Sequence, residues 1–328
     1  MTRNYEFVSG PRDYAELVLH DSEVALRAAV EAVNPDNPEA DPLEVFPAPG
    51  EVRNEDVGLE LSEEQGKALR AAAAQLGFER PNDAEPSSLG LRGAHFVIEG
   101  GQPHKIVAEA SMVAGDADAV PATLIFSASP HRHITSDAEK ASCENQFGEV
   151  LETEYEVARR AAESLEGFVA LEEDVVLPIG YDIDADFALV TETTGQFTQI
   201  GNVGDVPVLL LRIDREDYID ELGAAKYRKQ PGTDAVIRII DSASSALSDE
   251  TTPIALVTSS TYQASRSVDA ARVALNADRV IGVTTYGTQR LARVNKGIVP
   301  EPKRLEQLPG ELHKMAQEVI KLRDALNA

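Results

Sequence analysis

A short apolar run passes directly into hydroxyl side chains in the stretch Ile254-Ala-Leu-Val-Thr-Ser-Ser-Thr-Tyr-Gln-Ala-Ser-Arg266. The length of the apolar run, and Pro253 in front of it, predict a buried strand of a parallel sheet. A helix is predicted to follow, because apolar side chains then recur at helical spacing in a stripe that can lie on the sheet. The members of this stripe are Ala264, Val268, Ala271 and Leu275.

This strand–helix junction is the first candidate ligand site. Ser259, Ser260 and Thr261 can cap the helix. Gln263 and Arg266 stand three residues apart, so both can face the mouth of the site from the first helical turns. Helix N–H groups, hydroxyls and a guanidinium together suit an anion such as a phosphate or a carboxylate. The alternative is an ordinary junction with a capped helix and no ligand.

Further segments read as buried strands that alternate with helical segments. Such alternation implies a doubly wound sheet. The predicted fold class is therefore α/β, a mostly parallel Rossmann-like sheet with an N-terminal helical extension and a C-terminal helix. Besides the apolar run Ile254–Val257, the predicted strands are Ala94–Ile98, Ala122–Phe126, Val206–Ile213 and Arg279–Thr284.

Small or polar residues follow the first two of these strands. Gly100 and Gly101 come after the first, where paired glycines allow either a close approach to a ligand or a sharp turn. The loop after the second strand begins at Ser127, and in it Arg132 is expected to face the substrate and His131 to act as an acid or base. The His-x-His pair in this loop suggests a metal ligand set, but no second pair stands at ligand spacing, so no metal site is predicted.

Two carboxylates complete the candidate site. A strong helical pattern runs from Phe147 to Gly167, and Glu154 lies in its early part. The helix dipole favours acids there in any case, so taken alone this part of the helix reads as a solvated face. Asp214 follows the strand Val206–Ile213. Glu154 and Asp214 are candidates to bind a hydroxyl or amine, or to act as acid or base.

The chain divides into three predicted parts. Residues 1–90 form a helical cap, in which Ser62-Glu-Glu-Gln65 is a capping box and Gly77 closes the helix that it opens. Residues 91–295 form the ligand-binding domain. Within it, residues 169–205 are a possible β-hairpin insertion, whose strands are Ala185–Val190 and Gln196–Ile200.

Residues 296–328 contain an amphipathic C-terminal helix. Its apolar seam could dock on the domain or pair between subunits, and through the second alternative this helix offers a homo-oligomer contact. The seam consists of Leu308, Leu312, Met315, Val319, Leu322 and Leu326.

Composition limits the class of partner. The chain has 328 residues, 43% of them hydrophobic and 26% charged, which is close to the average for globular proteins. The formal net charge of −26 argues against nucleic acid or an anionic membrane as the main partner. Tryptophan is absent and aromatic residues are only 5%, which disfavours a stacking platform for single-stranded nucleic acid.

The single cysteine and the lack of long apolar runs limit compartment and chemistry. Cys143 is the single cysteine of the chain, so neither an intramolecular disulfide nor a metal site built from several cysteines can form. Its flanks mark it as a bystander rather than a nucleophile. The first residues lack an apolar core for export, and no apolar run has membrane length, so a cytoplasmic protein is expected.

From about Ala94 to Arg290 the chain resembles the SanA/YdcF/ElyC-like family, domain of unknown function 218. The resemblance lies in the order of the strand-end residues, and most of all in a Val-Thr-Ser-x-x-His-x-x-Arg junction. Gln263 stands where that family usually has histidine, and glutamine cannot transfer a proton. The matching segments are Gly100-Gly101, Ser127 to Arg132, Thr153-Glu154, Asp214 to Glu216 with Thr233, and Val257 to Arg266.

The resemblance implies a Rossmann-like protein that binds a small anionic or nucleotide-type ligand at the strand ends, and the net charge indicates that this protein is soluble. Relatives have been linked with S-adenosylmethionine binding and with envelope metabolism, so S-adenosylmethionine or a nucleotide is the cofactor that the resemblance suggests. A transferase or hydrolase is one reading, and a non-catalytic interaction module with a degenerate site is the other. The expected ligand-binding residues are Gly100, Gly101, Ser127, Arg132, Thr258, Ser259, Ser260, Gln263 and Arg266, with Glu154, Asp214 and His131 as catalytic candidates.

Overall fold

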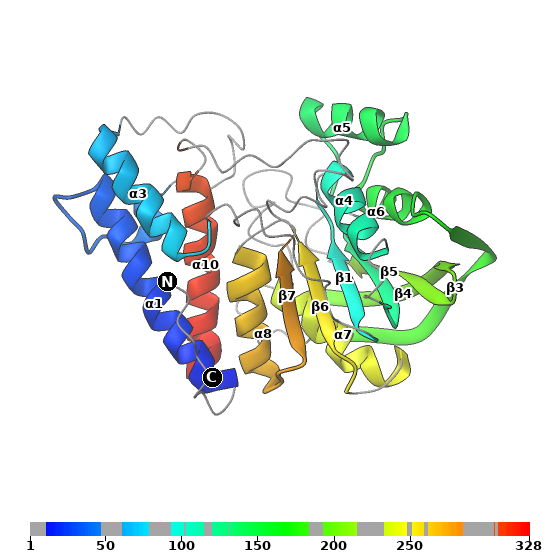
Figure 1. Ribbon diagram of the computed structural model, residues 1–328. Coiled ribbons are helices and arrows are strands. Elements are labelled where there is room, and N and C mark those ends of the chain that lie inside the picture. Colours follow the sequence, from blue (N-terminus) through cyan, green and yellow to red (C-terminus); the bar gives the residue numbers. More distant parts are fainter. Residues whose placement is uncertain are drawn as a thin grey trace. The chain divides into compact units, whose positions relative to one another are not determined.

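The chain folds into two compact units, each described by itself below (Figure 1). The helical unit comprises Met1–Asn82, Ser260–Asp278 and Pro300–Ala328, and the sheet unit comprises Asp83–Ser259 and Arg279–Val299. The computed structural model describes residues 11–46, 61–78, 93–101, 103–114, 120–130, 132–183, 193–214, 233–247, 251–258, 262–284, 305 and 308–328.

The sheet unit contains one seven-stranded sheet in the order β3-β4-β5-β2-β1-β6-β7. Five neighbouring strands are parallel, and β3 and β4 extend the sheet as antiparallel strands beyond β5. The fold class predicted from the sequence, a doubly wound and mostly parallel α/β sheet, is therefore confirmed. The strands are β1 His95–Glu99, β2 Thr123–Ala128, β3 Phe168–Ile183, β4 Thr193–Val203, β5 Val206–Asp214, β6 Ile254–Thr258 and β7 Val280–Thr284.

The chain adds parallel strands to one side of β1 first and to the other side afterwards, so the order of the strands reverses direction between β1 and β6. In chain order they are β1, β2, β5, β6 and β7, and in space they run β5-β2-β1-β6-β7. The connections from β1 to β2 and from β5 to β6 therefore run in opposite directions across the sheet. Because such crossovers are right-handed, helix α4 (Pro103–Ala114) and helix α7 (Thr233–Leu247) belong on opposite faces. The two faces are both covered, and Phe96, Val97 and Ile98 are accordingly fully buried.

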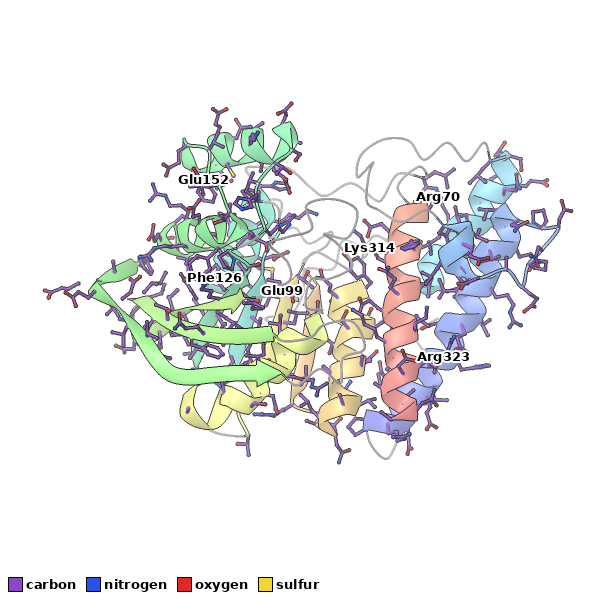
Figure 2. The ribbon with its side chains drawn as sticks, turned by 180° about the vertical axis from the view of Figure 1, so that it is seen from behind. Arg70, Glu99, Phe126, Glu152, Lys314 and Arg323 are labelled. Carbon is purple, nitrogen blue, oxygen red and sulfur yellow. The ribbon has the colours of Figure 1, made fainter. Side chains whose placement is uncertain are left out.

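One face of the sheet is covered by α4 and α6. Phe96, Ile98 and Phe126 on the strands form one core cluster with Ile106 of α4 and Val157 of α6. Phe126 is labelled in Figure 2. These alternate strand positions place large apolar side chains on the helix-covered face, which is how the short apolar runs of the sequence become a core.

The predicted helix from Phe147 to Gly167 was wrong in its bounds. Helix α5 (Asp137–Phe147) ends at Gly148, which has φ 79, and α6 (Glu154–Glu163) begins only after Thr153. Between them His133 and Thr153 form an antiparallel bridge. The loop after β2 thus pairs with the chain before α6, and this long-range contact replaces the helical turns that the local pattern favoured.

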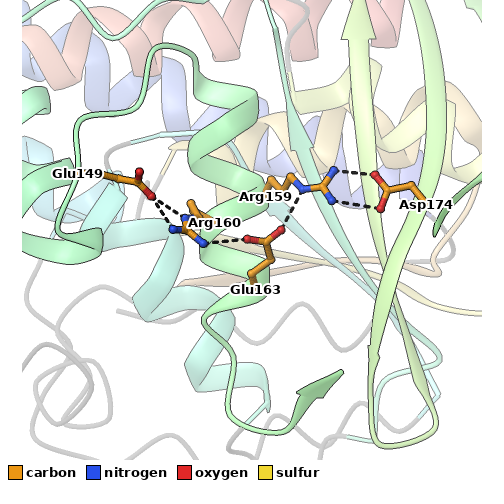
Figure 3. A network of polar contacts seen from close by, with 5 residues as sticks. All are labelled: Glu149, Arg159, Arg160, Glu163 and Asp174. Atoms are coloured by element: carbon orange, nitrogen blue, oxygen red, sulfur yellow. Dashed lines mark hydrogen bonds and ion pairs between the residues drawn. The ribbon is translucent and has the colours of Figure 1, made fainter. Parts of the chain in front are cut away.

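An antiparallel pair, β3 and β4, lies where the hairpin was predicted. The expected strand Gln196–Ile200 is part of β4, whereas the expected strand Ala185–Val190 lies outside the described residues. β3 has irregular register between Ala170 and Val175, and there its Asp174 is bound by Arg159 of α6. Figure 3 shows this contact within a network. The other members are Glu163, Arg160 and Glu149.

The helical unit is built from both ends of the chain. The capping box at Ser62 and Gln65 is present at α3, and Gly77 after it has φ 94, so these two predictions are confirmed. In the part of the chain that the structure describes, no helix is long and apolar enough to span a membrane. The helices are α1 Pro11–Val33, α2 Pro42–Val45, α3 Glu63–Gln75, the π-helical turn η3 Gln263–Ser267, α8 Val268–Leu275 and α10 Leu308–Asn327.

The C-terminal helix α10 packs on the N-terminal helices of the same chain. Leu312, Met315 and Val319 share a core cluster with Val30 of α1 and Leu69 of α3. Further along, Leu322 and Leu326 contact Ala15 and Val18 of α1. The predicted seam is thus buried within the unit, so a subunit contact would have to use another face of α10. Figure 2 labels Arg323, which pairs with Glu23 of α1 on such a face.

Of the apolar stripe predicted after β6, Val268 and Ala271 are buried on α8. The neighbouring positions Ala270 and Val273 of the same helix belong to the cluster formed by α1 and α10. The first turn of this helical segment is a π-helix, and Tyr262 at its start makes no side-chain cap. The expected caps Ser259, Ser260 and Thr261 lie outside the described residues.

Candidate functional site

The candidate site is centred on the turn that leaves β1. Glu99 ends the strand, Gly100 and Gly101 follow, and α4 begins at Pro103. The Gly100 N–H donates to the carbonyl of Ser127 at 2.7 Å, which ties this turn to the end of β2. The Glu99 carboxylate, labelled in Figure 2, accepts a 2.9 Å hydrogen bond from the Thr233 hydroxyl at the start of α7. The connections that leave β1, β2 and β5 therefore meet at the carboxyl ends of the parallel strands.

Glu154 lies directly against this turn. A Cβ placed on Gly100 would be 2.3 Å from the carboxyl carbon of Glu154, so only glycine leaves room for the carboxylate here. The Glu154 side chain is 8% exposed. Its Oε2 lies 3.5 Å from the N–H of Ser129, which is long for a hydrogen bond. The sequence offered a solvated face as one reading of Glu154, and the structure instead buries it at the strand ends.

Arg132 holds Glu154 in place from the loop after β2. Its Nη1 donates to Glu154, and its Nη2 donates to Glu139 of α5 at 3.1 Å. Glu139 also accepts from the Ser136 hydroxyl at 2.9 Å. The backbone adds to this arrangement, because the Glu154 N–H donates to the carbonyl of Arg132. We refer to Arg132, Glu139 and Glu154 as the Arg132 triad.

The triad gives Arg132 a different environment from the one expected of an anion contact. Its side chain is only 5% exposed, and two carboxylates bind its guanidinium. An arginine that is already paired in this way attracts a further anion weakly. Arg132 is therefore better described as the residue that fixes Glu154.

The neighbouring turn position, Gly101, has no close contacts among the described residues. A Cβ added to Gly101 would meet no atom of the described residues within 4 Å. Thr258 ends β6 and is buried, and the register of Ile98 with Val257 places Thr258 beside Glu99 at the same edge. The structure thus brings five of the predicted residues of the sheet unit to one end of the sheet, with Thr258 on the adjoining strand. These five are Gly100, Gly101, Ser127, Arg132 and Glu154.

The remaining described candidates lie on other elements, and Asp214 is at the same end of the sheet because β5 runs parallel to β2. Asp214 ends β5, which is separated from β1 by β2. Gln263 and Arg266 belong to the helical unit, where the Arg266 Nε donates to the Ser22 hydroxyl at 2.7 Å and Nη1 lies 3.9 Å from Asp269.

Three of the predicted residues cannot be placed. His131, Ser259 and Ser260 lie outside the described residues. Within the described part of the chain, no group of three or more His, Cys, Asp or Glu residues could hold a metal ion.

Sequence reasoning missed Glu139 and the pairing of Glu99 with Thr233. Ser136 and Glu139 stand at the spacing of a helix cap, and they do form one, with the Glu139 N–H donating to the Ser136 hydroxyl at 3.2 Å. Because the cap alone accounts for Glu139 in the sequence, its second contact, with Arg132, was not predicted. Glu99 was predicted only as part of a glycine turn, and no local signal indicates that Thr233 reaches it across 134 residues.

Two further groups near α4 and α5 are electrically neutral. Burial, and secondarily the charge of Lys105, lower the pKa of His104, whose Nδ1 lies 3.1 Å from the Ser142 hydroxyl. Burial raises the pKa of the Cys143 thiol, which is fully buried in the core under α5. A buried thiol with a raised pKa is a poor nucleophile, in agreement with its interpretation as a bystander.

Comparison of the chain with protein-family models, curated proteins and solved structures found no significant match. The resemblance to the SanA/YdcF/ElyC-like family therefore stays a prediction.

Proposed function

We propose that the sheet unit binds a small anionic or nucleotide-type ligand at the carboxyl ends of β1 and β6. The observation that carries this proposal is the strand order, because the direction of travel across the sheet reverses between these two strands. In open α/β sheets such a switch point leaves a crevice outside the strand ends, and ligands bind there.

The residues at this switch point suit such a ligand. A Cβ on Gly101 would meet no atom of the described residues within 4 Å, so these residues leave the backbone open to close approach. Helix α4 begins two residues later, and its first N–H groups and its dipole favour an anionic group at that end. Thr258 at the end of β6 supplies a hydroxyl from the other side of the crevice. The anionic part of the ligand is thus expected between α4 and β6.

Glu154 supplies the polar contact on the β2 side. It is held by Arg132 and lies against Gly100, so its carboxylate has a fixed position at the strand ends. A fixed carboxylate can accept a hydroxyl or amine, or transfer a proton in a transferase or hydrolase reaction. S-Adenosylmethionine and nucleotides are the ligands to test first, since the family resemblance suggests them.

A non-catalytic interaction module is the second candidate. It is favoured by the pairing of Arg132 with two carboxylates, since a saturated buried arginine is also typical of a purely structural ion pair. Under this alternative the crevice binds no small molecule.

A thermal-shift screen of the full chain separates these two candidates. The panel contains phosphate, AMP, ATP, S-adenosylmethionine, S-adenosylhomocysteine, UDP-glucose and divalent metals. A ligand that binds only the folded state raises the midpoint of unfolding. The shift should shrink in Gly101→Ala and disappear in Gly101→Val, because the larger side chain fills the approach to the turn without contacting described atoms. No shift with any compound would exclude the small-molecule proposal in favour of the interaction module.

A further inference from the structure

The net charge of the Arg132 triad indicates which chemical group of a ligand would bind Glu154. Two carboxylates share one guanidinium, and the side chains of Arg132, Glu139 and Glu154 are 5%, 13% and 8% exposed. In their charged forms, one positive and two negative groups leave an excess of one negative charge. Within the described residues, neither carboxylate has an ion pair with any other cation.

This excess negative charge is best placed on Glu154. Glu139 accepts hydrogen bonds from Arg132 and from the Ser136 hydroxyl, so both of its oxygens have partners. Glu154 Oε1 accepts from Arg132, whereas Oε2 has only the 3.5 Å contact with the Ser129 N–H. An ionised carboxylate can accept about four hydrogen bonds. Glu154 Oε2 therefore has acceptor capacity left, at the ends of β1 and β2.

The dipoles of α5 and α6 offset part of this charge, because Glu139 and Glu154 lie in the first turns of these helices, and the remainder is costly unless an opposite charge neutralises it. Nearby water can screen it only weakly, because the three side chains are almost wholly buried. A cationic group on the ligand would both neutralise the charge and fill the remaining acceptor sites of Glu154.

We infer that the ligand carries a cationic amino group, which binds Glu154 at the ends of β1 and β2. This inference rests on the function proposed above and deepens it. The ligand then has an anionic group toward α4 and an ammonium group toward Glu154. Arg132 and Glu139 are positioning residues, because they fix the carboxylate without contacting the ligand.

Matched pairs of compounds that differ in one amino group test this inference. The pairs are 5′-amino-5′-deoxyadenosine with adenosine, glucosamine 6-phosphate with glucose 6-phosphate, and S-adenosylhomocysteine with its desamino analogue. Affinities are measured with the full chain by calorimetry at pH 7. In the pair that binds, the amine is expected to bind about tenfold or more tightly than its partner, the effect of one charged hydrogen bond. Glu154→Gln keeps the shape of the side chain and should reduce this preference to below about twofold.

Two further variants keep the test independent of folding. Glu139→Gln removes the excess charge but leaves Glu154, so it should reduce the preference to about threefold. This variant serves where Glu154→Gln does not fold. Glu163→Gln is the matched control, because Glu163 lies on the same helix but takes part in the surface network of Figure 3. It should leave the preference unchanged.

The outcomes separate the inference from the proposed function. If neither the screen nor any pair shows binding, the proposed function fails and the inference falls with it. If compounds bind but amines have no advantage, the function stands and the inference is overturned. An advantage that persists in both Glu154→Gln and Glu139→Gln also overturns it, because the ammonium group would then bind elsewhere.

Discussion

The two units bury charge in opposite arrangements. In the sheet unit an arginine, Arg132, lies between two carboxylates, with Nη2 3.1 Å from Glu139. In the helical unit a carboxylate, Asp269, lies between two arginines, with its oxygens 3.9 Å from Arg266 and 3.7 Å from Arg272. The first arrangement is hydrogen-bonded, and the second has the longer distances of ion pairs without direct hydrogen bonds.

The difference has a consequence for titration. Burial raises the pKa of Asp269 to about 6, although the charges of Arg266 and Arg272 act to lower it. The partners of this aspartate are themselves engaged elsewhere, since Arg266 donates to Ser22 and Arg272 lies over the ring of Tyr14. The charges of Glu139 and Glu154 are thus stabilised by hydrogen bonds from Arg132. The charge of Asp269 has only the longer ion pairs with Arg266 and Arg272, and burial disfavours it. We expect the Arg132 triad to contribute to the unfolding free energy, and Asp269 to make the unfolding free energy depend on pH.

The largest expected effect is that of Arg132→Ala. This change leaves two buried carboxylates without their cation, which typically costs about 3–5 kcal/mol of unfolding free energy. Urea unfolding at pH 7, followed by circular dichroism, measures it. Arg160→Ala, in the exposed network of Figure 3, is the control and should change stability little. A loss for Arg132→Ala as small as that of the control would show that the triad is not a stabilising element.

The next effect concerns His95, the buried histidine of the sheet unit. Burial, and secondarily the charge of Arg279, lower its pKa from 6.5 to about 4. Its Nδ1 lies 2.7 Å from the Thr123 hydroxyl. A lowered pKa means that stability is fully present above pH 6.5 and is lost as the pH falls toward 4, by about 2–3 kcal/mol.

His95→Asn should remove this dependence, because asparagine does not titrate. The measurement is the unfolding free energy of wild type and variant at several pH values between 4 and 7. The difference between the two proteins should change with pH, and parallel curves would contradict the expected pKa.

Asp269 in the helical unit should show the opposite sign. Its pKa is raised from 3.8 to about 6, so its stabilising contribution is present at low pH and is lost as the pH rises through 6. The loss amounts to about 2 kcal/mol between pH 4 and pH 7. Asp269→Asn should therefore gain stability relative to wild type as the pH rises. Asp278→Asn serves as the control, because Asp278 is 69% exposed and pairs with the same Arg272. A similar pH dependence in both variants would contradict the assignment to Asp269.

Much of the sheet could be predicted from the sequence because its signals are local. The apolar runs Ala94–Ile98 and Ala122–Phe126 match β1 and β2 within about two residues, since short buried strands need only a hydrophobic run and a turn signal. The rule that parallel strands end at one edge also brought Gly100 and Ser127 into one predicted site, whereas Glu154 entered it through the family resemblance.

The parts that the sequence could not predict depend on distant contacts. The bridge between His133 and Thr153 joins the loop after β2 to the residue that caps α6, and no local pattern encodes this pairing. The contact of Arg266 with Ser22, 244 residues away in the chain, likewise has no local signal. Glu139 has a local cap as a sufficient explanation, which conceals its contact with Arg132. Charged side chains reach partners that periodicity does not reveal.

The smallest of these effects, and the most specific to the site, is that of Gly100→Ala. The added Cβ would be 2.3 Å from the carboxyl carbon of Glu154, whose position is fixed by Arg132, so overpacking should cost about 1–3 kcal/mol. Gly101→Ala is the matched control and should cost little, since its Cβ meets no described atom within 4 Å.

A double-mutant cycle shows whether the Gly100→Ala cost arises from Glu154. In a Glu154→Ala background the carboxylate is gone, so Gly100→Ala should cost no more than Gly101→Ala. The unfolding free energies of the four proteins in the cycle give the coupling directly. If Gly100→Ala costs the same with and without the carboxylate, the turn is strained for another reason. Glu154 would then not be the residue that requires glycine at the end of β1.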